Sequence, residues 1–203
     1  MGADGPMTYG EPAGPPNVRA PYRVLVVCTG NVHRSPLAER LLTQRLGSVS
    51  QFIQVSSVGT DARQGTPMAP QSAALLAEMG GDPTGAVAHR LTADLVRCSD
   101  LVLGAAAEHC EAAVRMSPQW ALHRAFTLRE LARLLRLEDT AGVSGPIARA
   151  TAQVEGAARG RGSVGATADD DVADPQGAPL EVARACAVRI EEAVERIVRA
   201  VLG

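Results

Sequence analysis

Two residues near the start of the chain stand at a spacing that suits chemistry on an oxyanion. Cys28 and Arg34 follow the pattern C-x5-R. A cysteine thiolate is a strong nucleophile, and a guanidinium fork matches two oxygens of a phosphate group. The spacing alone is weakly specific, because the 20 basic residues are all arginine, and four cysteines would give on the order of 0.4 matches by chance. The residues between the pair decide what it means.

The sequence around this pair predicts a loop that can hold an anion. The run 22–28 is short, apolar and β-branched, as in a strand buried on both faces. A Ser-Pro pair at 35–36 opens a helical pattern. Backbone N–H groups of residues 29–34 can therefore point inward at the positive end of a helix. Gly30 and Asn31 are residue types that tolerate the dihedral angles of such a loop. The same positive environment would favour the thiolate.

Strand and helix patterns alternate along the rest of the chain. Short apolar runs predict strands, and apolar residues at helical spacing predict helices between them. This alternation is typical of a parallel sheet with helices on both faces. We therefore expect a single three-layer α/β domain with a central parallel sheet of about four strands. The predicted strands are 22–28, 52–56, 100–103 and 124–126, and the predicted helices are 35–47, 67–79, 92–97, 106–116, 127–137 and 179–202.

Two segments do not follow this alternation. Residues 1–21 contain five proline and four glycine residues and almost no periodic apolar pattern. This composition predicts a disordered leader before a domain at 22–203. Residues 138–168 are rich in Gly, Ala and Arg, and we expect an insertion or a mobile loop there. Part of that segment, at about 146–159, is compatible with a helix.

The overall composition disfavours several classes of protein. The formal net charge is −2, the mean hydropathy is +0.02, and no apolar run approaches the roughly 18 residues of a membrane-spanning helix. A nucleic-acid-coating protein, a membrane protein and a disordered chain are therefore poor interpretations. The four cysteines show no C-x-x-C pair and no metal-type spacing, and we expect a cytoplasmic protein. The sequence predicts no oligomeric state.

The loop sequence resembles that of a known family. Residues 27–36, VCTGNVHRSP, closely resemble the phosphate-binding signature of the low-molecular-weight protein tyrosine phosphatases. Further matches follow in the family's order, so that the resemblance covers roughly 22–137 and 169–201. It implies a phosphatase I-like fold. The matching segments are Ser57-Val58-Gly59-Thr60, Gly65-Thr66-Pro67-Met68, Ala88-His89-Arg90-Leu91-Thr92, and Asp174-Pro175 before the last helix.

The resemblance implies catalytic roles for three residues. Cys28 would attack phosphorus in line and form a cysteinyl-phosphate. Arg34 would bind the phosphoryl oxygens and stabilise the transition state. Asp174 would protonate the leaving oxygen and then activate water for the second step.

The resemblance also implies how the loop is supported. Ser35 would hydrogen-bond the thiolate and help it to leave during hydrolysis. Asn31 would hold the loop through a side-chain network that includes Ser57. The residues expected to bind phosphate or support the loop are Thr29, Gly30, Asn31, Val32, His33, Ser35 and Ser57.

Together these roles imply a metal-independent phosphomonoester hydrolase with no cofactor and with phosphotyrosine on a protein as the default substrate. The loop and Arg34 would supply the positive charge. Because the nucleophile must be ionised while the acid is protonated, activity should favour mildly acidic pH. The expected partners are a phosphorylated protein or a small phosphoester, with no nucleic acid and no membrane.

Several positions depart from the family's pattern. His33 stands where the family often has a second cysteine, and it could add positive charge to the loop. Ala86 replaces an expected supporting histidine. Residues 61–64 (Asp-Ala-Arg-Gln) and Gln176 replace aromatic pocket walls, and aromatic residues make up only 2% of the chain. Val32 stands where arginine-phosphate-specific relatives are expected to carry threonine. A smaller or non-aromatic phosphoester therefore competes with phosphotyrosine as the substrate.

Two other functions stay open. A catalytically weak phosphate-binding or regulatory module would explain the altered pocket walls. An arsenate reductase would share the loop, but it needs further thiols close together, and Cys98 and Cys110 are 12 residues apart. Other residues receive plainer interpretations: Cys186 as core, Asp169–Asp171 as a solvated loop, Arg63 as surface charge, and His89, His109 and His123 as surface or core residues without a special role.

Overall fold

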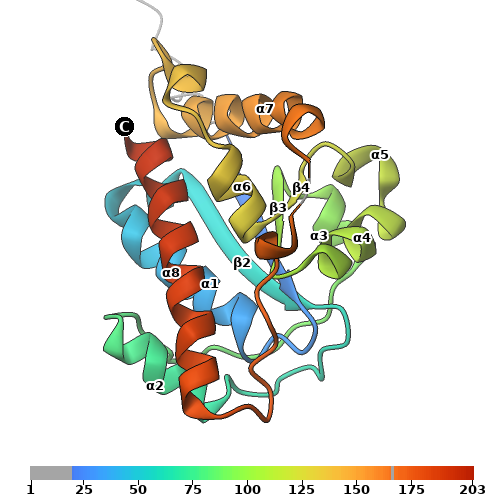
Figure 1. The fold of residues 1–203 in the computed structure, drawn as a ribbon, viewed down its shortest axis with the longest axis vertical. Coiled ribbons are helices and arrows are strands. Elements are labelled where there is room, and N and C mark those ends of the chain that lie inside the picture. Colours follow the sequence, from blue (N-terminus) through green and yellow to red (C-terminus); the bar gives the residue numbers. More distant parts are fainter. Residues whose placement is uncertain (1–19, 166) are drawn as a thin grey trace, which may run out of the picture.

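The computed structural model describes residues 20–165 and 167–203 (Figure 1). The leader predicted for residues 1–21 therefore lies almost entirely outside the described residues. No helix in the described ranges is long and apolar enough to cross a membrane.

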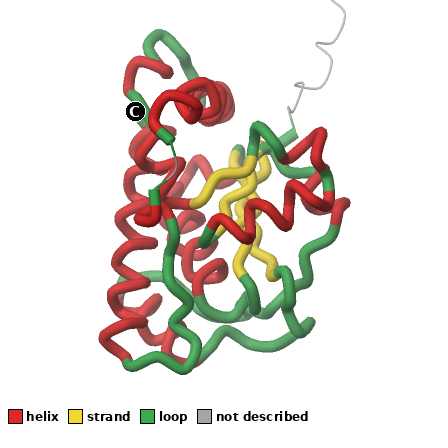
Figure 2. Tube along the Cα trace, turned by 45° about the vertical axis from the view of Figure 1, so that its right-hand side comes forward, coloured by secondary structure: helices red, strands yellow, loops and turns green. Residues whose placement is uncertain are grey.

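The centre of the fold is a parallel sheet of four strands in the order β2-β1-β3-β4. Strand β1 is buried almost throughout, because β2 and β3 pair with its two sides and helices cover both faces (Figure 2). The predicted α/β class with a central parallel sheet is confirmed. Since the strands are parallel, their carboxyl ends meet at one edge, where ligands bind in such sheets. The strands are β1 (Tyr22–Cys28), β2 (Ile53–Gly59), β3 (Leu101–Gly104) and β4 (Ala125–Thr127).

Helices cover the two faces of the sheet unequally. Alternate residues of β1 point to opposite faces, so Val24 and Val26 join one core cluster while Leu25 and Val27 join another. The larger cluster includes side chains from α1, α6, α7 and α8, and the smaller includes side chains from α3, α4 and α5. The helices are α1 (Arg34–Leu46), α2 (Pro70–Glu78), α3 (Ala93–Arg97), α4 (Ala107–Met116), α5 (Pro118–Ala121), α6 (Leu128–Leu134), α7 (Pro146–Val164) and α8 (Leu180–Leu202).

Element boundaries differ from the prediction at several points. Helix α2 begins three residues late, because Pro67 forms an isolated bridge with Val87 before the helix. Helix α6 ends at Leu134, and a 3-10 turn follows at Leu137–Thr140. The four-residue helix α5 was not predicted, since its sequence is too short to show periodicity.

The segment 138–168 contains more regular structure than the predicted insertion or mobile loop. Helix α7 occupies 19 of its residues, beginning with Pro146 after Gly145 at φ 87°. Ala150, Val154 and Ala157 are buried in the larger core cluster. Glycines within the helix weakened its sequence pattern. One of them faces Asp139, since a Cβ at Gly156 would lie about 2.2 Å from that side chain, which would have to move.

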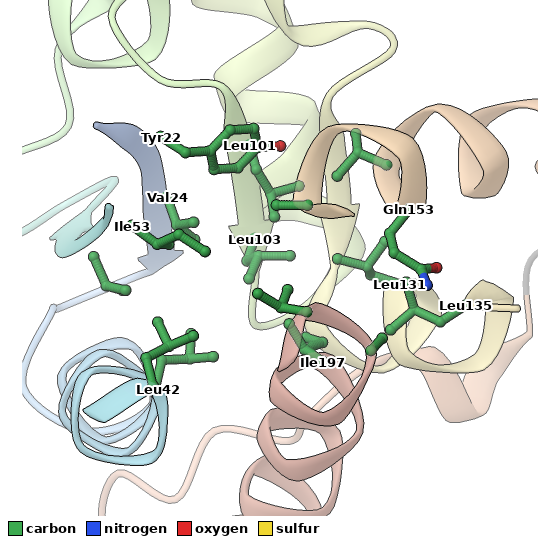
Figure 3. Close-up of a pocket in the computed structure, with 16 residues that line it drawn as sticks. Tyr22, Val24, Leu42, Ile53, Leu101, Leu103, Leu131, Leu135, Gln153 and Ile197 are labelled. Carbon is green, nitrogen blue, oxygen red and sulfur yellow. The ribbon is translucent and has the colours of Figure 1, made fainter. Parts of the chain in front are cut away.

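A small cavity lies within the larger cluster, against the sheet and helices α1, α6, α7 and α8 (Figure 3). Its volume is about 30 Å³, and its lining is aliphatic apart from Tyr22 and Gln153. Gln153 is 2% exposed, and its Nε2 donates to the carbonyl of Arg136 at 3.2 Å. Its Oε1 has no hydrogen-bond partner among the described residues. The core here is therefore incompletely filled.

Candidate active site

The predicted loop connects the carboxyl end of β1 to the start of α1. Cys28 is 1% exposed, and the Asn31 N–H donates to its Sγ at 3.3 Å. Asn31 has φ 54°, the one non-glycine residue with positive φ in the described part of the chain. Gly30 does not have a positive φ, so of the two residue types expected to tolerate unusual dihedrals only Asn31 is in the left-handed region. The tight turn of the loop is made at Asn31 alone, a residue type that tolerates this conformation.

A second backbone constraint comes from Gly59, at the end of β2. A Cβ there would lie 2.4 Å from the Thr29 carbonyl oxygen and 2.9 Å from the Asn31 nitrogen. The residues just after β2 also donate toward the loop, since the N–H of Thr60 donates to the Cys28 carbonyl and the N–H of Asp61 donates to the Thr29 carbonyl, each at 2.9 Å. The close approach therefore requires glycine at this position.

A network of polar side chains holds Cys28 and its loop. The Ser35 Oγ lies 2.9 Å from the Cys28 Sγ. The Asn31 Nδ2 donates to both Ser35 and Ser57, each at 2.9 Å. The Ser57 hydroxyl donates to Glu39 at 2.5 Å, a residue that the sequence analysis did not single out. These contacts bring the predicted supporting residues together, and a carboxylate ends the network.

The Arg34 side chain is 4% exposed and links the loop to the segment that carries Asp174. Its Nη1 donates to the Val172 carbonyl at 3.0 Å, and its Nη2 donates to Asp174 at 2.5 Å and to Thr29 at 3.3 Å. Its Nε is buried without a partner among the described residues. The N–H groups of Gly30, Val32 and His33 likewise have no hydrogen-bond partner in that part of the chain. Unused donors of this kind favour an oxyanion.

Asp174 lies on the segment before α8 and is 42% exposed on its side chain. One carboxylate oxygen accepts from Arg34, and the other accepts from the N–H of Gln176 at 3.1 Å. The N–H of Val172 donates to the Ala105 carbonyl at 2.8 Å, which ties this segment to the end of β3. The structure therefore places Asp174 beside Arg34, although the two residues are 140 positions apart in the sequence.

The acidic run 169–171 is not simply solvated, so that interpretation is wrong. Asp170 is 5% exposed, and both its oxygens accept from Arg133 at 3.0 and 2.8 Å. Burial raises the pKa of Asp170, but hydrogen bonds from Arg133 and Thr167 outweigh it and hold that pKa below its usual range. Asp171 accepts from the N–H of Ala107 at 2.8 Å. Both contacts anchor the segment that carries Asp174.

Two histidines, one in the loop and one beside it, make contacts that the sequence did not show. The His33 Nδ1 lies 2.8 Å from the Ser72 hydroxyl, and burial lowers the pKa of His33, with Asp174 opposing and Arg34 adding to the shift. This disfavours the positive charge expected there. His109 is 1% exposed, and its Nε2 lies 3.1 Å from the Thr29 hydroxyl. The interpretation of His109 as a residue without a special role is therefore incomplete.

The walls around the loop are polar. Asp61 and Arg63 are exposed, and Gln64 contacts the His89 Nδ1 at 2.9 Å. Gln176 is exposed next to Asp174. The four aromatic residues in the described ranges lie elsewhere: Tyr22 and Phe52 at the amino ends of β1 and β2, Trp120 on α5, and Phe126 buried in β4.

The position of Ala86 explains how the loop holds without the expected histidine. Ala86 is buried in the larger core cluster. The Asn31 Oδ1 accepts instead from the backbone N–H of His89 at 2.7 Å. A main-chain group thus satisfies the amide oxygen, and no side chain is needed there.

All four cysteines are free. Burial raises the pKa of Cys110 to about 12, so its thiol is a poor source of thiolate at neutral pH. Cys186 donates to the Ala173 carbonyl at 3.3 Å and packs in the core, as its helical position predicted. Within residues 20–165 and 167–203, no three His, Cys, Asp or Glu side chains cluster as a metal site would require.

Comparison with known proteins agrees with this geometry. A family model for low molecular weight phosphotyrosine protein phosphatase matches residues 23–155. The low molecular weight protein-tyrosine-phosphatase Etp of Escherichia coli is 36% identical over 96 residues, or 47% of this chain and 62% of Etp. The chain thus matches less than two thirds of that relative. A protein-arginine-phosphatase of Geobacillus stearothermophilus is 29% identical over 180 residues, covering 87% of this chain and 94% of the relative.

A solved structure shows the same architecture. The YwlE arginine phosphatase from Geobacillus stearothermophilus superposes with a TM-score of 0.64 at 26% identity. The match covers 88% of this chain and 92% of that structure. With the family model matching well over half of the residues, the chain belongs to the low molecular weight phosphotyrosine protein phosphatase family.

Proposed function

We propose that this chain hydrolyses phosphomonoesters through a cysteinyl-phosphate intermediate, without a metal ion. The observation that carries the proposal is the buried Arg34 Nε, which has no partner in the described chain and accompanies unused loop N–H groups around Cys28. A dianionic phosphoryl group would satisfy these donors. Arg34 and the loop would then stabilise the extra charge of the transition state.

In the first step, the Cys28 thiolate attacks phosphorus, and the bond between phosphorus and the leaving oxygen breaks. Asp174 gives its proton to that oxygen. The Asp174 carboxylate is paired with Arg34 in the free protein, so it must release the guanidinium and take up a proton before it can act as the acid. Substrate binding supplies the competing anion for Arg34.

In the second step, water attacks phosphorus, and Asp174 accepts the proton of that water. The bond between sulfur and phosphorus breaks, and the thiolate is released with inorganic phosphate. The Ser35 hydroxyl, 2.9 Å from the sulfur, is placed to donate to the departing thiolate. Activity should favour mildly acidic pH, because the acid must be protonated while the nucleophile is ionised.

The substrate beyond the phosphoryl group is a separate question. Relatives are named as tyrosine phosphatases and as an arginine phosphatase. Phosphotyrosine on a protein is the family default, but no described aromatic ring lies beside the loop, and the polar Gln64 and Gln176 occupy the expected wall positions. Val32 offers no hydroxyl to a phosphoarginine. These features favour a smaller or non-aromatic phosphoester.

The test is hydrolysis of p-nitrophenyl phosphate between pH 5 and 7 by the full chain. Cys28→Ser should abolish turnover, and Asp174→Ala should accumulate phospho-enzyme. A parallel panel of phosphotyrosine, phosphoarginine and small-metabolite phosphates at one enzyme concentration ranks the substrates. Tight binding of inorganic phosphate without turnover would contradict the proposal and favour a phosphate-binding module instead.

A further inference from the structure

We propose that His109 is a positioning residue for this chemistry: its buried neutral imidazole fixes the Thr29 hydroxyl, which in turn holds the Arg34 guanidinium. The proposal rests on the proposed function, because it concerns how Arg34 is held for a phosphoryl group. The contact joins helix α4, beyond the end of β3, to the loop beyond β1, across 80 residues of sequence.

The first turn of α4 defines the tautomer of His109. The N–H of Ala106 donates to the His109 Nδ1 at 3.0 Å, so this nitrogen must be the acceptor. The ring proton is therefore on Nε2, which donates to the Thr29 Oγ1 at 3.1 Å. Glu108 lies 3.5 Å from the same Nε2, but its side chain is 70% exposed and the contact is longer.

The surroundings of His109 favour the neutral ring. Burial and the nearby Arg34 lower the pKa of His109, and Glu108, Asp174 and the contact with Ala106 only partly oppose this. A protonated ring would also direct an N–H at the Ala106 N–H, since both nitrogens of an imidazolium are donors. The helix terminus and the ring thus fit only when His109 is neutral.

The Thr29 hydroxyl receives two donors. One is the His109 Nε2 and the other is the Arg34 Nη2, at 3.3 Å. A hydroxyl has two lone pairs, so both are used, and its own hydrogen must point away from both donors. The hydroxyl is therefore held in one orientation, with its acceptor side toward Arg34.

This arrangement matters most when Asp174 acts. Asp174 is the other side chain bonded to the Arg34 Nη2, and it must leave the guanidinium to deliver its proton. Thr29 then remains on Nη2, while the Val172 carbonyl remains on Nη1. Through Thr29, His109 would thus keep the Arg34 guanidinium aligned during the step in which Asp174 leaves it.

Two substitutions separate this role from simple capping of α4. His109→Asn keeps an acceptor near the Nδ1 position for the Ala106 N–H but cannot reach Thr29. His109→Gln keeps a donor near the Nε2 position. We expect His109→Asn to lower kcat/KM for p-nitrophenyl phosphate and the affinity for inorganic phosphate, each by about tenfold, the effect of one hydrogen bond on a charged group. His109→Gln should recover a substantial part of both.

A third substitution tests the relay itself. Thr29→Val removes the hydroxyl at nearly constant shape, and it should weaken phosphate binding as much as His109→Asn does. The double variant should be no worse than Thr29→Val alone, because the two residues act in series.

Wild-type kcat/KM and phosphate affinity in a folded His109→Asn protein would overturn the inference. His109 would then only cap the start of α4. Additive losses in the double variant would overturn it too. A wild-type chain that neither binds phosphate by calorimetry nor hydrolyses p-nitrophenyl phosphate would instead refute the proposed function, and this inference with it.

Discussion

The loop around Cys28 and the core cavity each bury a polar atom without a partner, in surroundings that differ in polarity. The Arg34 Nε lies at the carboxyl edge of the sheet, on the loop that carries unused N–H groups and follows Cys28. The Gln153 Oε1 lies beside a cavity of about 30 Å³ with an aliphatic lining. Burying an unpaired polar group costs roughly 1–3 kcal/mol, and more where the group is charged, as in Arg34. In the loop an anion can recover that cost, whereas at the cavity none of the described residues, Tyr22 of the lining included, donates to the Gln153 Oε1.

The difference between the two surroundings shows how a buried polar atom without a hydrogen-bond partner can be interpreted. An unpaired donor among other unpaired donors describes the shape and charge of a ligand. An unpaired acceptor among methyl groups describes imperfect packing, and in this chain it follows from a core made almost wholly of Leu, Val, Ile and Ala. Substitution at each region should therefore affect different properties.

Arg34→Lys should have the largest effect. Lysine keeps the charge but loses the planar fork, and the Nε that we assign to a phosphoryl oxygen disappears. We expect kcat for p-nitrophenyl phosphate to fall by about 10²–10³-fold, as for loss of one oxyanion donor. Phosphate should raise the thermal midpoint of the wild type and hardly that of the variant.

The matched change at the cavity is Gln153→Met, which removes the unpaired Oε1 and keeps a side chain of similar volume. It should leave kcat unchanged, and phosphate should stabilise this variant as it does the wild type. A comparable loss of activity in both variants would break the distinction between the two regions.

Gly59→Ala should come next in size. The added methyl group would meet the backbone of Thr29 and Asn31, which cannot move without opening the loop. We expect a loss of about 1–3 kcal/mol in the free energy of unfolding by urea, together with lost activity. Gly30→Ala is the control, because its Cβ would meet only Val32, at an ordinary 3.5 Å. Equal stability losses at both positions would contradict the close approach as the cause.

The loop itself was predictable because its signals are local. A β-branched run, a turn and a Ser-Pro helix start fall within 15 residues, and their order already specifies an anion loop at a strand end. The strands were placed for the same reason, although β2 extends three residues further, to the glycine that packs on the loop.

Residues that act across the fold were not predictable in this way. Glu39 and His109 are ordinary helical residues in sequence, and their partners Ser57 and Thr29 lie 18 and 80 residues away. Asp170 was predicted to be one of three solvated acidic residues, but it forms an ion pair with Arg133 on α6. Val182 stands at helical spacing from the buried Cys186 and Ile190 of α8, yet it is 41% exposed, because the packed stripe of this helix is narrower than its apolar one. Tertiary contacts, not local patterns, decide such cases.

Val154→Ile should sharpen the comparison from the cavity side. The side chain lines the cavity, and one added methylene suits a volume of about 30 Å³. Filling it should raise the free energy of unfolding by about 0.8 kcal/mol, with kcat unchanged. Val26→Ile is the control, since Val26 is fully buried in the same cluster but does not line the cavity, and overpacking there should cost about 1–3 kcal/mol. Stabilisation by both substitutions would show that the whole core cluster is loosely packed, and not only the region of the cavity.

The smallest effect should be a pH dependence of the free energy of unfolding that comes from the two histidines in and beside the loop, His33 and His109. Burial lowers the pKa values of His33 and His109 in the folded state, so the unfolded chain binds more protons once the pH falls below about 6.5. The stability from these neutral rings is therefore complete above that pH and is lost progressively as the pH falls below it. Asp170, whose pKa is also lowered, loses its contribution only below about 4, which separates the two windows. Urea unfolding of His109→Asn at pH 7.5 and pH 5 should show a smaller decrease than the wild type. The exposed His123→Asn should match the wild type, and a decrease that is unchanged in His109→Asn would show that the acid sensitivity does not come from the loop.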